Sequence, residues 1–305
     1  MSFIVQTTLE LGMMYALVSM ALFLSYRVLD IADLTTDGAF VLGMAVSVTS
    51  AAAGHPVLGI FAAMLAGSAA GYVTAFLQTR LGVPSILAGI VTNTGLYTVN
   101  LMAMGWSSNA NILRQQTIFT LFRSLGIGGR WYSLILSTCI TVLSGVILVW
   151  FLGTRIGLSL RATGDNRDMV RASSINPTST ITIGLCLANA LTALSGAVVG
   201  QAQKSADINA GTGIVVIGLA CLIIGETVCR RGSVRRGVTA TVVGSVLYRF
   251  IYAIVLKTKI VPIECLKLVT AIIVGLAIAM PSIRAWIAFQ SRKARAGKEG
   301  GDVNA

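Results

Sequence analysis

The chain has 305 residues, of which 55% are hydrophobic and 11% are charged, and its mean hydropathy is +0.83. An average soluble domain carries about 25% charged residues, so this composition excludes an ordinary cytosolic enzyme and a disordered chain and indicates a membrane protein. The net charge of +12 is explained by basic residues beside apolar segments, so we expect membrane lipid and no nucleic acid among the partners.

Nine apolar segments follow one another along the chain. The first, 11–28, has neither a basic segment nor a small-residue cleavage site before it, so it predicts a retained span and not a signal peptide. The others lie at 38–53, 57–79, 83–104, 131–152, 180–203, 213–228, 238–256 and 262–285. We therefore expect an all-α, polytopic membrane helix bundle of about nine (eight to ten) transmembrane helices, with one transmembrane domain over residues 1–289 and a cytoplasmic basic tail over 290–305.

The basic connections predict the orientation. Arginine and lysine are concentrated in 153–179, in 229–237 and in the tail after 289. These three segments fall on one side of a nine-span chain, so we place them in the cytoplasm and the N-terminus outside. The external connection 105–130 is the exception, because it carries Arg114, Arg123 and Arg130.

The segment before the second span is polar and acidic. Asp30, Asp33 and Asp37 lie here, with Thr35 and Thr36 between the last two. One interpretation is that Asp37 or Thr36 caps the following helix, because carboxylates and hydroxyls stabilise a helix N-terminus. The other is a broken helix that dips into the membrane, where free amides and acidic side chains line a polar cavity. Both interpretations stay open.

A weak internal repeat links this segment to a later one. Asp33–Gly43 recurs loosely as Asp207–Gly218, with one residue inserted. Five predicted spans separate the copies, so they enter the membrane from opposite sides, as in an inverted-topology repeat with substrate between its halves. Chance similarity of Gly-rich apolar segments is the alternative. On the repeat interpretation, the acidic and polar residues of both copies line the substrate pathway: Asp33, Thr36, Asp37, Asp207 and Asn209.

A few polar side chains lie inside predicted spans. Asn93, Asn100 and Asn189 must find partners in lipid, so hydrogen bonds between helices are the default, and Asn93 and Asn189 are also candidates for the substrate pathway. Arg249 either extends to the membrane surface or pairs with an acid near the outer side, Glu10 or Glu264.

Small residues mark one span in particular. Gly67 and Gly71 form a GxxxG pattern within a run of alanines. Lipid gives helices no hydrophobic reason to associate, so close approach over glycine supplies the packing energy. A tightly packed bundle is the favoured interpretation and a subunit contact the other.

Catalytic and cofactor signatures are missing from the sequence. His55 is the only histidine, so neither a catalytic triad nor a histidine metal site can form. The sequence has no G-x-x-x-x-G-K-[ST] phosphate loop, and its five cysteines show no metal or disulfide spacing. We expect a protein that is not an enzyme, with no metal and no cofactor.

The connection 153–179 combines charge with an apolar patch. Asp165 or Asn166 can cap a short helix that ends before Pro177, and Met169 and Val170 give it an apolar side. Such a helix could dock into a groove on a cytosolic partner. The alternative is a solvated, positively charged loop.

This segment and its surroundings resemble the permease subunits of bacterial ABC importers, in the branched-chain amino acid and ribose permease superfamily. The likeness is greatest to the branch that is paired with substrate-binding lipoproteins and linked to amino acids, including aromatic ones. Ser174 departs from the family pattern, which usually has glycine there. The matching residues are Arg161–Asn166, Met169–Ala172, Ile175–Asn176, Gly184–Leu185, Ala188–Leu191, Leu194–Ala197, Gln201, Asp207–Asn209, Val216–Ala220 and Ile223–Glu226, with Asp33–Thr35 and Asp37–Gly38 near the start.

The resemblance implies the partners. A separate cytosolic ATP-binding subunit would contact the coupling segment 153–179, an extracytoplasmic lipoprotein would deliver the solute, and a second, identical permease subunit would complete the path in the bacterial inner membrane. The coupling residues implied in this way are Arg161, Asp165, Asn166, Met169, Val170, Arg171 and Ile175.

We therefore expect the permease subunit of an ATP-driven ABC importer for a small polar solute, an amino acid in the first place. Helix N-termini near Gly38 and Gly213 could bind its carboxylate, and Asp33 or Asp207 its ammonium group. An ion-coupled secondary transporter is the alternative, although few carboxylates lie inside the spans. An inactive membrane anchor is a third possibility.

Overall fold

The computed structural model describes residues 2–124, 126, 129–229 and 232–258, and the isolated positions 268, 271, 272, 274, 275, 279 and 286. The chain divides into two units, 1–254 and 255–305, and the fold below is that of the first. The predicted ninth span at 262–285 lies largely outside the described residues. The tail 290–305 and the arginines at 230 and 231 lie entirely outside them.

The described chain is almost entirely helical, which confirms the predicted all-α class. The elements are α1 Ser2–Leu22, continued by a π-helix Phe23–Val28, then α2 Thr35–Ala52, α3 Pro56–Thr79, α4 Ser85–Ala103, β1 Asn109–Asn111, α5 Ile118–Ser124, a 3-10 turn Gly129–Trp131, α6 Tyr132–Gly153, α7 Arg155–Asp165, α8 Arg167–Ala172, α9 Pro177–Gln203, β2 Ser205–Asp207, a 3-10 turn Ile208–Gly211, α10 Ile214–Cys229 and α11 Val234–Thr258.

Each of the first eight predicted spans corresponds to one of the described helices. Seven helical segments in the described part of the chain are long and apolar enough to cross a membrane. The one predicted span among these eight that is not in that set is the second, 38–53, which corresponds to α2; this helix has 18 residues and carries Asp37 in its first turn. The predicted count of about nine is therefore consistent with the structure.

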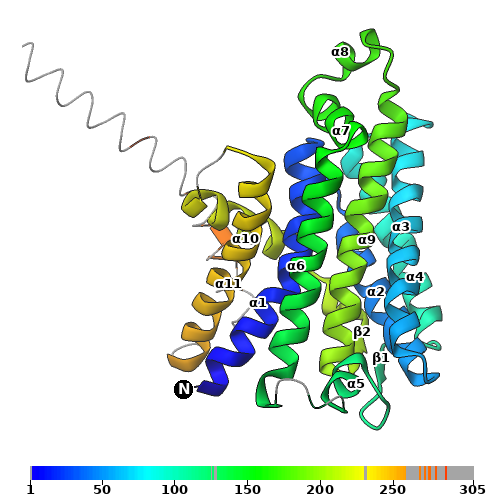
Figure 1. The fold of residues 1–305 in the computed structure, drawn as a ribbon. Helices are drawn as coiled ribbons and strands as arrows, with labels where there is room; N and C mark the ends of the chain where they lie inside the picture. Colours follow the sequence, from blue (N-terminus) through cyan, green and yellow to red (C-terminus); the bar gives the residue numbers. More distant parts are fainter. Residues whose placement is uncertain are drawn as a thin grey trace, which may run out of the picture. The chain divides into compact units, whose positions relative to one another are not determined.

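The two ends of the helix bundle carry different small elements (Figure 1). Helices α7 and α8 form one end, which we call the α7–α8 end. At the other end β1 pairs antiparallel with β2, Asn109 opposite Asp207, and we call this the ribbon end. Helix α1 starts at the ribbon end, and α9 runs from the α7–α8 end to the ribbon end.

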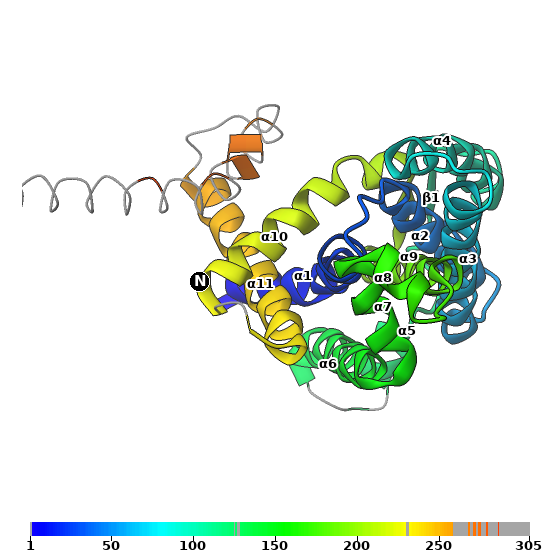
Figure 2. The same ribbon diagram turned by 90° about the horizontal axis from the view of Figure 1, so that it is seen from above.

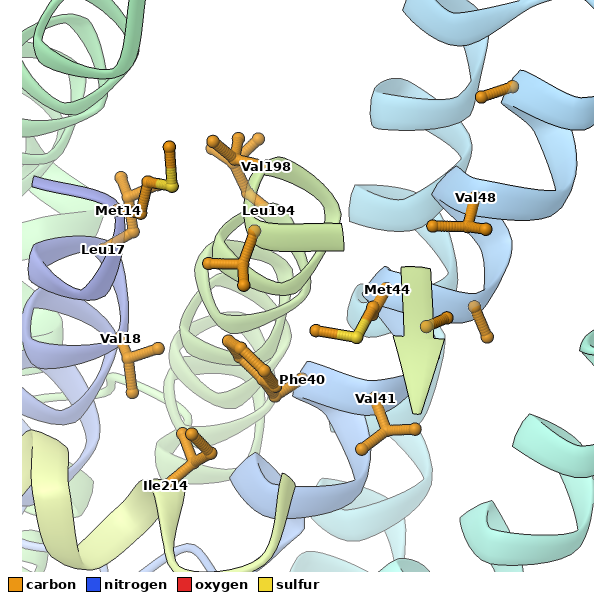
Figure 3. Packing of buried hydrophobic residues seen from close by; sticks show 14 of the residues in the cluster. Met14, Leu17, Val18, Phe40, Val41, Met44, Val48, Leu194, Val198 and Ile214 are labelled. Carbon is orange, nitrogen blue, oxygen red and sulfur yellow. The ribbon is translucent and has the colours of Figure 1, made fainter. Parts of the chain in front are cut away.

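Helix α9 forms the centre of the bundle. In an apolar 18-residue stretch of α9, 78% of the residues are buried, whereas in the corresponding stretch of α6, at the edge of the bundle, 22% are buried. Apolar side chains of α1, α2 and α9 and the first residue of α10 meet in one core (Figure 3). The ring of Phe40, which has no exposed surface, lies 5.9 Å from that of Tyr15 in this core.

Close backbone contact holds α3 against α9. A Cβ atom on Gly67 would lie 2.4 Å from Cβ of Ala193, and one on Gly71 would lie 2.4 Å from the carbonyl oxygen of Leu185. Glycine is therefore required at both positions. The GxxxG pattern serves packing within the bundle, as the favoured interpretation predicted.

Candidate functional site

The polar segment between α1 and α2 enters the bundle. The π-helix at the end of α1 closes with a hydrogen bond from Ile31 N–H to the Ser25 carbonyl oxygen, and Asp30 turns the chain with φ of 54°. Leu29 and Ile31 are each 1% exposed. The next helix, α2, therefore begins inside the protein.

Asp33 lies in this segment and is 3% exposed. Its Oδ1 accepts a hydrogen bond from Thr35 N–H at 2.9 Å, and its Oδ2 accepts one from Nδ2 of Asn189 at 2.7 Å. Asn189 follows the first residue of α9, Pro177, by twelve positions, which corresponds to a depth of about 18 Å below that end of the helix. Asp33 is thus near the middle of the bundle's height.

The same junction contains two further buried groups. The hydroxyl of Thr35 lies 2.7 Å from that of Thr74 on α3, so α2, α3 and α9 are joined by polar contacts around Asp33. Asn189 is 1% exposed, donates a second hydrogen bond to the Leu185 carbonyl oxygen at 3.0 Å, and leaves its own Oδ1 without a partner. A buried acceptor of this kind is costly unless another state of the protein supplies a donor.

Asp37 joins α2 to the start of α10. Its Oδ1 accepts a hydrogen bond from Val215 N–H at 2.9 Å and its Oδ2 one from Gly213 N–H at 3.2 Å. The prediction that Asp37 or Thr36 caps its own helix is wrong: Asp33 binds the first amide of α2, while Asp37 satisfies free amides of α10, where a carboxylate is favoured. Thr36 donates its hydroxyl hydrogen to the Asp33 carbonyl oxygen at 3.2 Å.

Helices α2 and α10 run in opposite directions from this meeting point. Helix α2 runs toward the ribbon end. On α9, which also runs that way, Gly196 packs against Phe40 of α2, and Gly200, one turn further along, packs against Met44. Helix α10 runs toward the α7–α8 end, since the Ser19 hydroxyl donates to the Gly218 carbonyl oxygen at 3.2 Å and Glu226 lies 3.1 Å from Arg27. Helices α2 and α10, of 18 and 16 residues, therefore start inside the bundle and run toward opposite ends, an arrangement consistent with the predicted inverted repeat.

The other polar residues singled out in the sequence divide into two groups: Asn93 and Asn100 contact α2 at Gly38, whereas Asp207 and Asn209 lie at the ribbon end. Asn100, 2% exposed, donates to the Gly38 carbonyl oxygen at 3.2 Å, and its Oδ1 has no partner. Asn93 packs against Gly38, where a Cβ would lie 2.5 Å from its Oδ1. Asp207 instead lies in β2 at the ribbon end and accepts a hydrogen bond from the backbone N–H of the exposed Asn209 at 2.8 Å.

Sequence reasoning did not single out Thr74, whose hydroxyl lies against Thr35. A lone threonine inside an apolar span gives no local signal, because it also satisfies itself by bonding the carbonyl four residues earlier, as Thr74 does with Ala70. In the described part of the chain, no group of three or more His, Cys, Asp or Glu side chains could hold a metal ion.

The predicted coupling segment forms two short helices. Asn166 ends α7 and caps α8, accepting hydrogen bonds from the amides of Asp168 and Met169, both at 3.0 Å, so the cap predicted at 165 or 166 is Asn166. Val170 is 1% exposed and Met169 61% exposed, which leaves an apolar group on the surface of α8. Arg171 is exposed and Ile175 half-buried after it, whereas Arg161 and Asp165 belong to α7.

The intramembrane arginine has an aromatic partner. The guanidinium of Arg249 lies 3.7 Å from the ring centroid of Tyr15 and 5.9 Å from that of Tyr252. A cation stacked on a ring in this way is stabilised where water is scarce. Arg249 does not form the predicted ion pair with Glu10, and the other predicted acid, Glu264, lies outside the described residues.

Comparison with known proteins gives a consistent result. The family described as "Branched-chain amino acid transport system / permease component" matches residues 4–281. A protein named "Tyrosine transport system permease protein" from Clostridioides difficile (strain R20291) is 30% identical over 264 residues, 86% of each chain. An uncharacterized protein from Rickettsia prowazekii (strain Madrid E) is 31% identical over 277 residues, 90% of this chain and 96% of its own. No solved structure matches.

Proposed function

The chain belongs to the family of permease components of branched-chain amino acid transport systems, and on this premise we propose that it imports an amino acid with energy from ATP hydrolysed on a separate cytosolic subunit. As an ABC-type permease it is a transport subunit, not an enzyme, and a multi-pass protein of the inner membrane. The tyrosine permease among its relatives makes tyrosine the first solute to test.

The junction of α2 and α10 is the observation that carries this proposal. Helices α2 and α10 start inside the bundle with their N-termini directed at acidic side chains, the arrangement in which transporters bind a solute near mid-membrane. Asp33 is buried at this junction, and Asn189 beside it has a free acceptor oxygen. A small solute with an ammonium group would supply the missing donor.

The solute's carboxylate has a competitor at the same junction. The N–H groups of Gly213 and Val215, at the start of α10, donate hydrogen bonds to Asp37. A solute carboxylate could bind there only by displacing Asp37. We therefore assign the ammonium group to Asp33 and Asn189, and we propose that release of Asp37 from α10 accompanies opening of the path.

The coupling segment would transmit the work of the ATP-binding subunit. Exposed Met169 on α8 is the kind of apolar anchor that fits a groove on a partner, and the segment leads directly into the central helix α9 through Pro177. We propose that movement of α8 is passed to α9 and so to Asn189. The binding lipoprotein and the second, identical permease subunit remain proposals of the same kind.

Uptake by the reconstituted complex tests the proposal. We expect liposomes that contain the permease, its ATP-binding subunit and the binding lipoprotein to take up labelled tyrosine, and vanadate to stop this uptake. Asp33→Asn should lower uptake at least tenfold, because the loss of a charge-assisted hydrogen bond is equivalent to about 1.5 kcal/mol or more.

The matched control is Asp30→Asn. Asp30 is three residues away and exposed, and asparagine tolerates its positive φ, so this variant removes the same charge without touching the junction. Uptake that resists vanadate and follows an ion gradient would contradict ATP coupling. Equal uptake by the two variants would contradict the assignment of Asp33.

A further inference from the structure

A large groove lies between α6 and α11, away from the candidate solute junction. It encloses about 1160 Å³, above the range of about 300–1,000 Å³ typical of sites for small ligands. The two helices lie beside each other at the edge of the bundle (Figure 2). The groove extends along α6 from Thr141 to Gly153, which corresponds to about 18 Å, comparable to the length of a lipid acyl chain.

The walls of this α6–α11 groove are apolar. Valines line it from both helices, among them Val142, Val146 and Val149 of α6 and Val238 and Val242 of α11. Val142 and Val146 are 56% and 61% exposed. The inner part of the groove therefore favours a hydrocarbon chain over a polar solute.

The mouth of the groove, at the α7–α8 end, is basic. Arg161 of α7 and Arg235 of α11 line it together with Ser233. Nε of Arg161 is buried without a hydrogen-bond partner, and neither arginine forms an ion pair with a described residue. The acids Asp165 and Glu226 line a neighbouring pocket that shares Arg161 and Ser233 with this mouth, and Glu226 pairs there with Arg27 at 3.1 Å.

The mouth also lies at the level where lipid headgroups are expected. Trp150 lines the groove, is 71% exposed and precedes the end of α6 by three residues. Tryptophan is enriched at the boundary between hydrocarbon and water. The arginines are thus placed at headgroup depth, with the valines below them at the depth of the acyl chains.

We propose that the α6–α11 groove is a binding site for an anionic phospholipid. The valine walls hold an acyl chain, and Arg161 and Arg235 bind the phosphate, in the way that basic pockets between transmembrane helices bind anionic headgroups. Charge complementarity selects this occupant: a zwitterionic lipid would leave the pair of arginines less well compensated, and a free phosphate would leave the apolar walls exposed.

Native mass spectrometry of the purified full-length chain tests the proposal. We expect phosphatidylglycerol to stay bound where phosphatidylcholine of the same chain length is lost. The double variant Arg161→Gln with Arg235→Gln should weaken phosphatidylglycerol binding about thirtyfold, equivalent to about 1 kcal/mol for each arginine. Replacing both arginines with lysine should restore most of it.

A charge-matched control separates this site from general attraction to the basic end. Arg167→Gln with Arg171→Gln removes two exposed arginines of α8 and should leave lipid binding unchanged. Val146→Trp narrows the apolar part while keeping both arginines, and should weaken lipid binding without changing the elution volume of the protein.

Several results would overturn the proposal. One is equal loss of lipid in the two double-glutamine variants, and another is equal retention of both lipids. Glycerol phosphate that competes as well as the whole lipid would show that the valine walls do not take part. Binding that appears only after removal of residues 259–305 would mean that the chain's own segment fills the groove.

Discussion

Ser174 adopts a backbone conformation that suits glycine. Its φ is 59°, which costs an L-residue roughly 1–2 kcal/mol, and this is the position where the resembling family usually has glycine. The turn between α8 and α9 is therefore formed at some cost. The backbone at Ser174 thus lies in the left-handed region that glycine adopts without this cost.

We predict that Ser174→Gly stabilises this turn by about 0.5–1 kcal/mol, since the gain in the left-handed region exceeds the added freedom of the unfolded chain. Hydrogen exchange of the amides in 167–176 should slow. Ser173→Gly is the control, because Ser173 has an ordinary φ of −86° and glycine there should speed exchange. Faster exchange in both variants would contradict the prediction.

Arg249 illustrates what sequence can say about a single residue. Its position inside an apolar span marked it as a charge that must extend to the membrane surface or pair with an acid. The partner is the ring of Tyr15 on α1. The sequence does not predict this contact, because 234 positions separate the two residues. In addition, an aromatic side chain near the middle of a span usually packs against apolar neighbours.

At the scale of the helix, glycine spacing determines which pairs pack closely. We predict that Gly67→Ala destabilises the protein by about 1–3 kcal/mol, because the added Cβ would lie 2.5 Å from the carbonyl oxygen of Asn189 and a packed core tolerates overfilling poorly. Thermal unfolding in detergent measures this. Gly95→Ala on α4 is the control, since nothing lies within 4 Å of its added Cβ.

Gly95→Ala should leave the midpoint unchanged or raise it slightly, because alanine is the better helix former. The same shift in both variants would mean that helix propensity, and not contact with α9, governs the effect. The site of Gly67 also adjoins Asn189, so a loss of tyrosine uptake in Gly67→Ala at a temperature where the fold is intact would indicate that the junction is sensitive to the spacing of α3 and α9.

The helices themselves were largely predictable, but their depth was not. Apolar runs located α2 within three residues at its start and α10 within one, because hydropathy depends on local composition alone. Hydropathy does not reveal that each helix starts inside the bundle. The clue was Asp33, but an acid before an apolar run predicts a cap and a buried junction equally well. Only the contacts of Asp33 with Asn189 and of Asp37 with Gly213 distinguish them, and each of these pairs is more than 150 positions apart in the sequence.

The coupling segment was predicted only in part: the cap of α8 was expected, and the separate helix α7 was not. Asn166 was one of two predicted caps, and the structure selects it. The helix N-terminal to it, α7, was not predicted as a separate element, because its 11 residues mix arginines and glycines with a few apolar side chains and so do not form an apolar run. Arg161 therefore lies one helix before the predicted docking helix and faces the α6–α11 groove.

For the whole molecule, the distribution of arginines determines the expected orientation. The α7–α8 end carries most of them: Arg27, Arg80, Arg155, Arg161, Arg167, Arg171, Arg235 and Arg236. The ribbon end carries Arg114, Arg123 and Arg130, all in the connection between α4 and α6. The exception noted in the sequence is real but is outnumbered, so the α7–α8 end should face the cytoplasm.

Labelling of single cysteines checks this orientation in intact membranes. In a background without Cys139, Cys186, Cys221, Cys229 and Cys265, we predict that Asn111→Cys at the ribbon end reacts with an impermeant maleimide in right-side-out vesicles. Asp168→Cys on α8 should react only in inside-out vesicles, because both native side chains are exposed and lie at opposite ends of the bundle. The reverse pattern would place α8 outside, where no cytosolic ATP-binding subunit could reach it, and would contradict both the orientation and the coupling role.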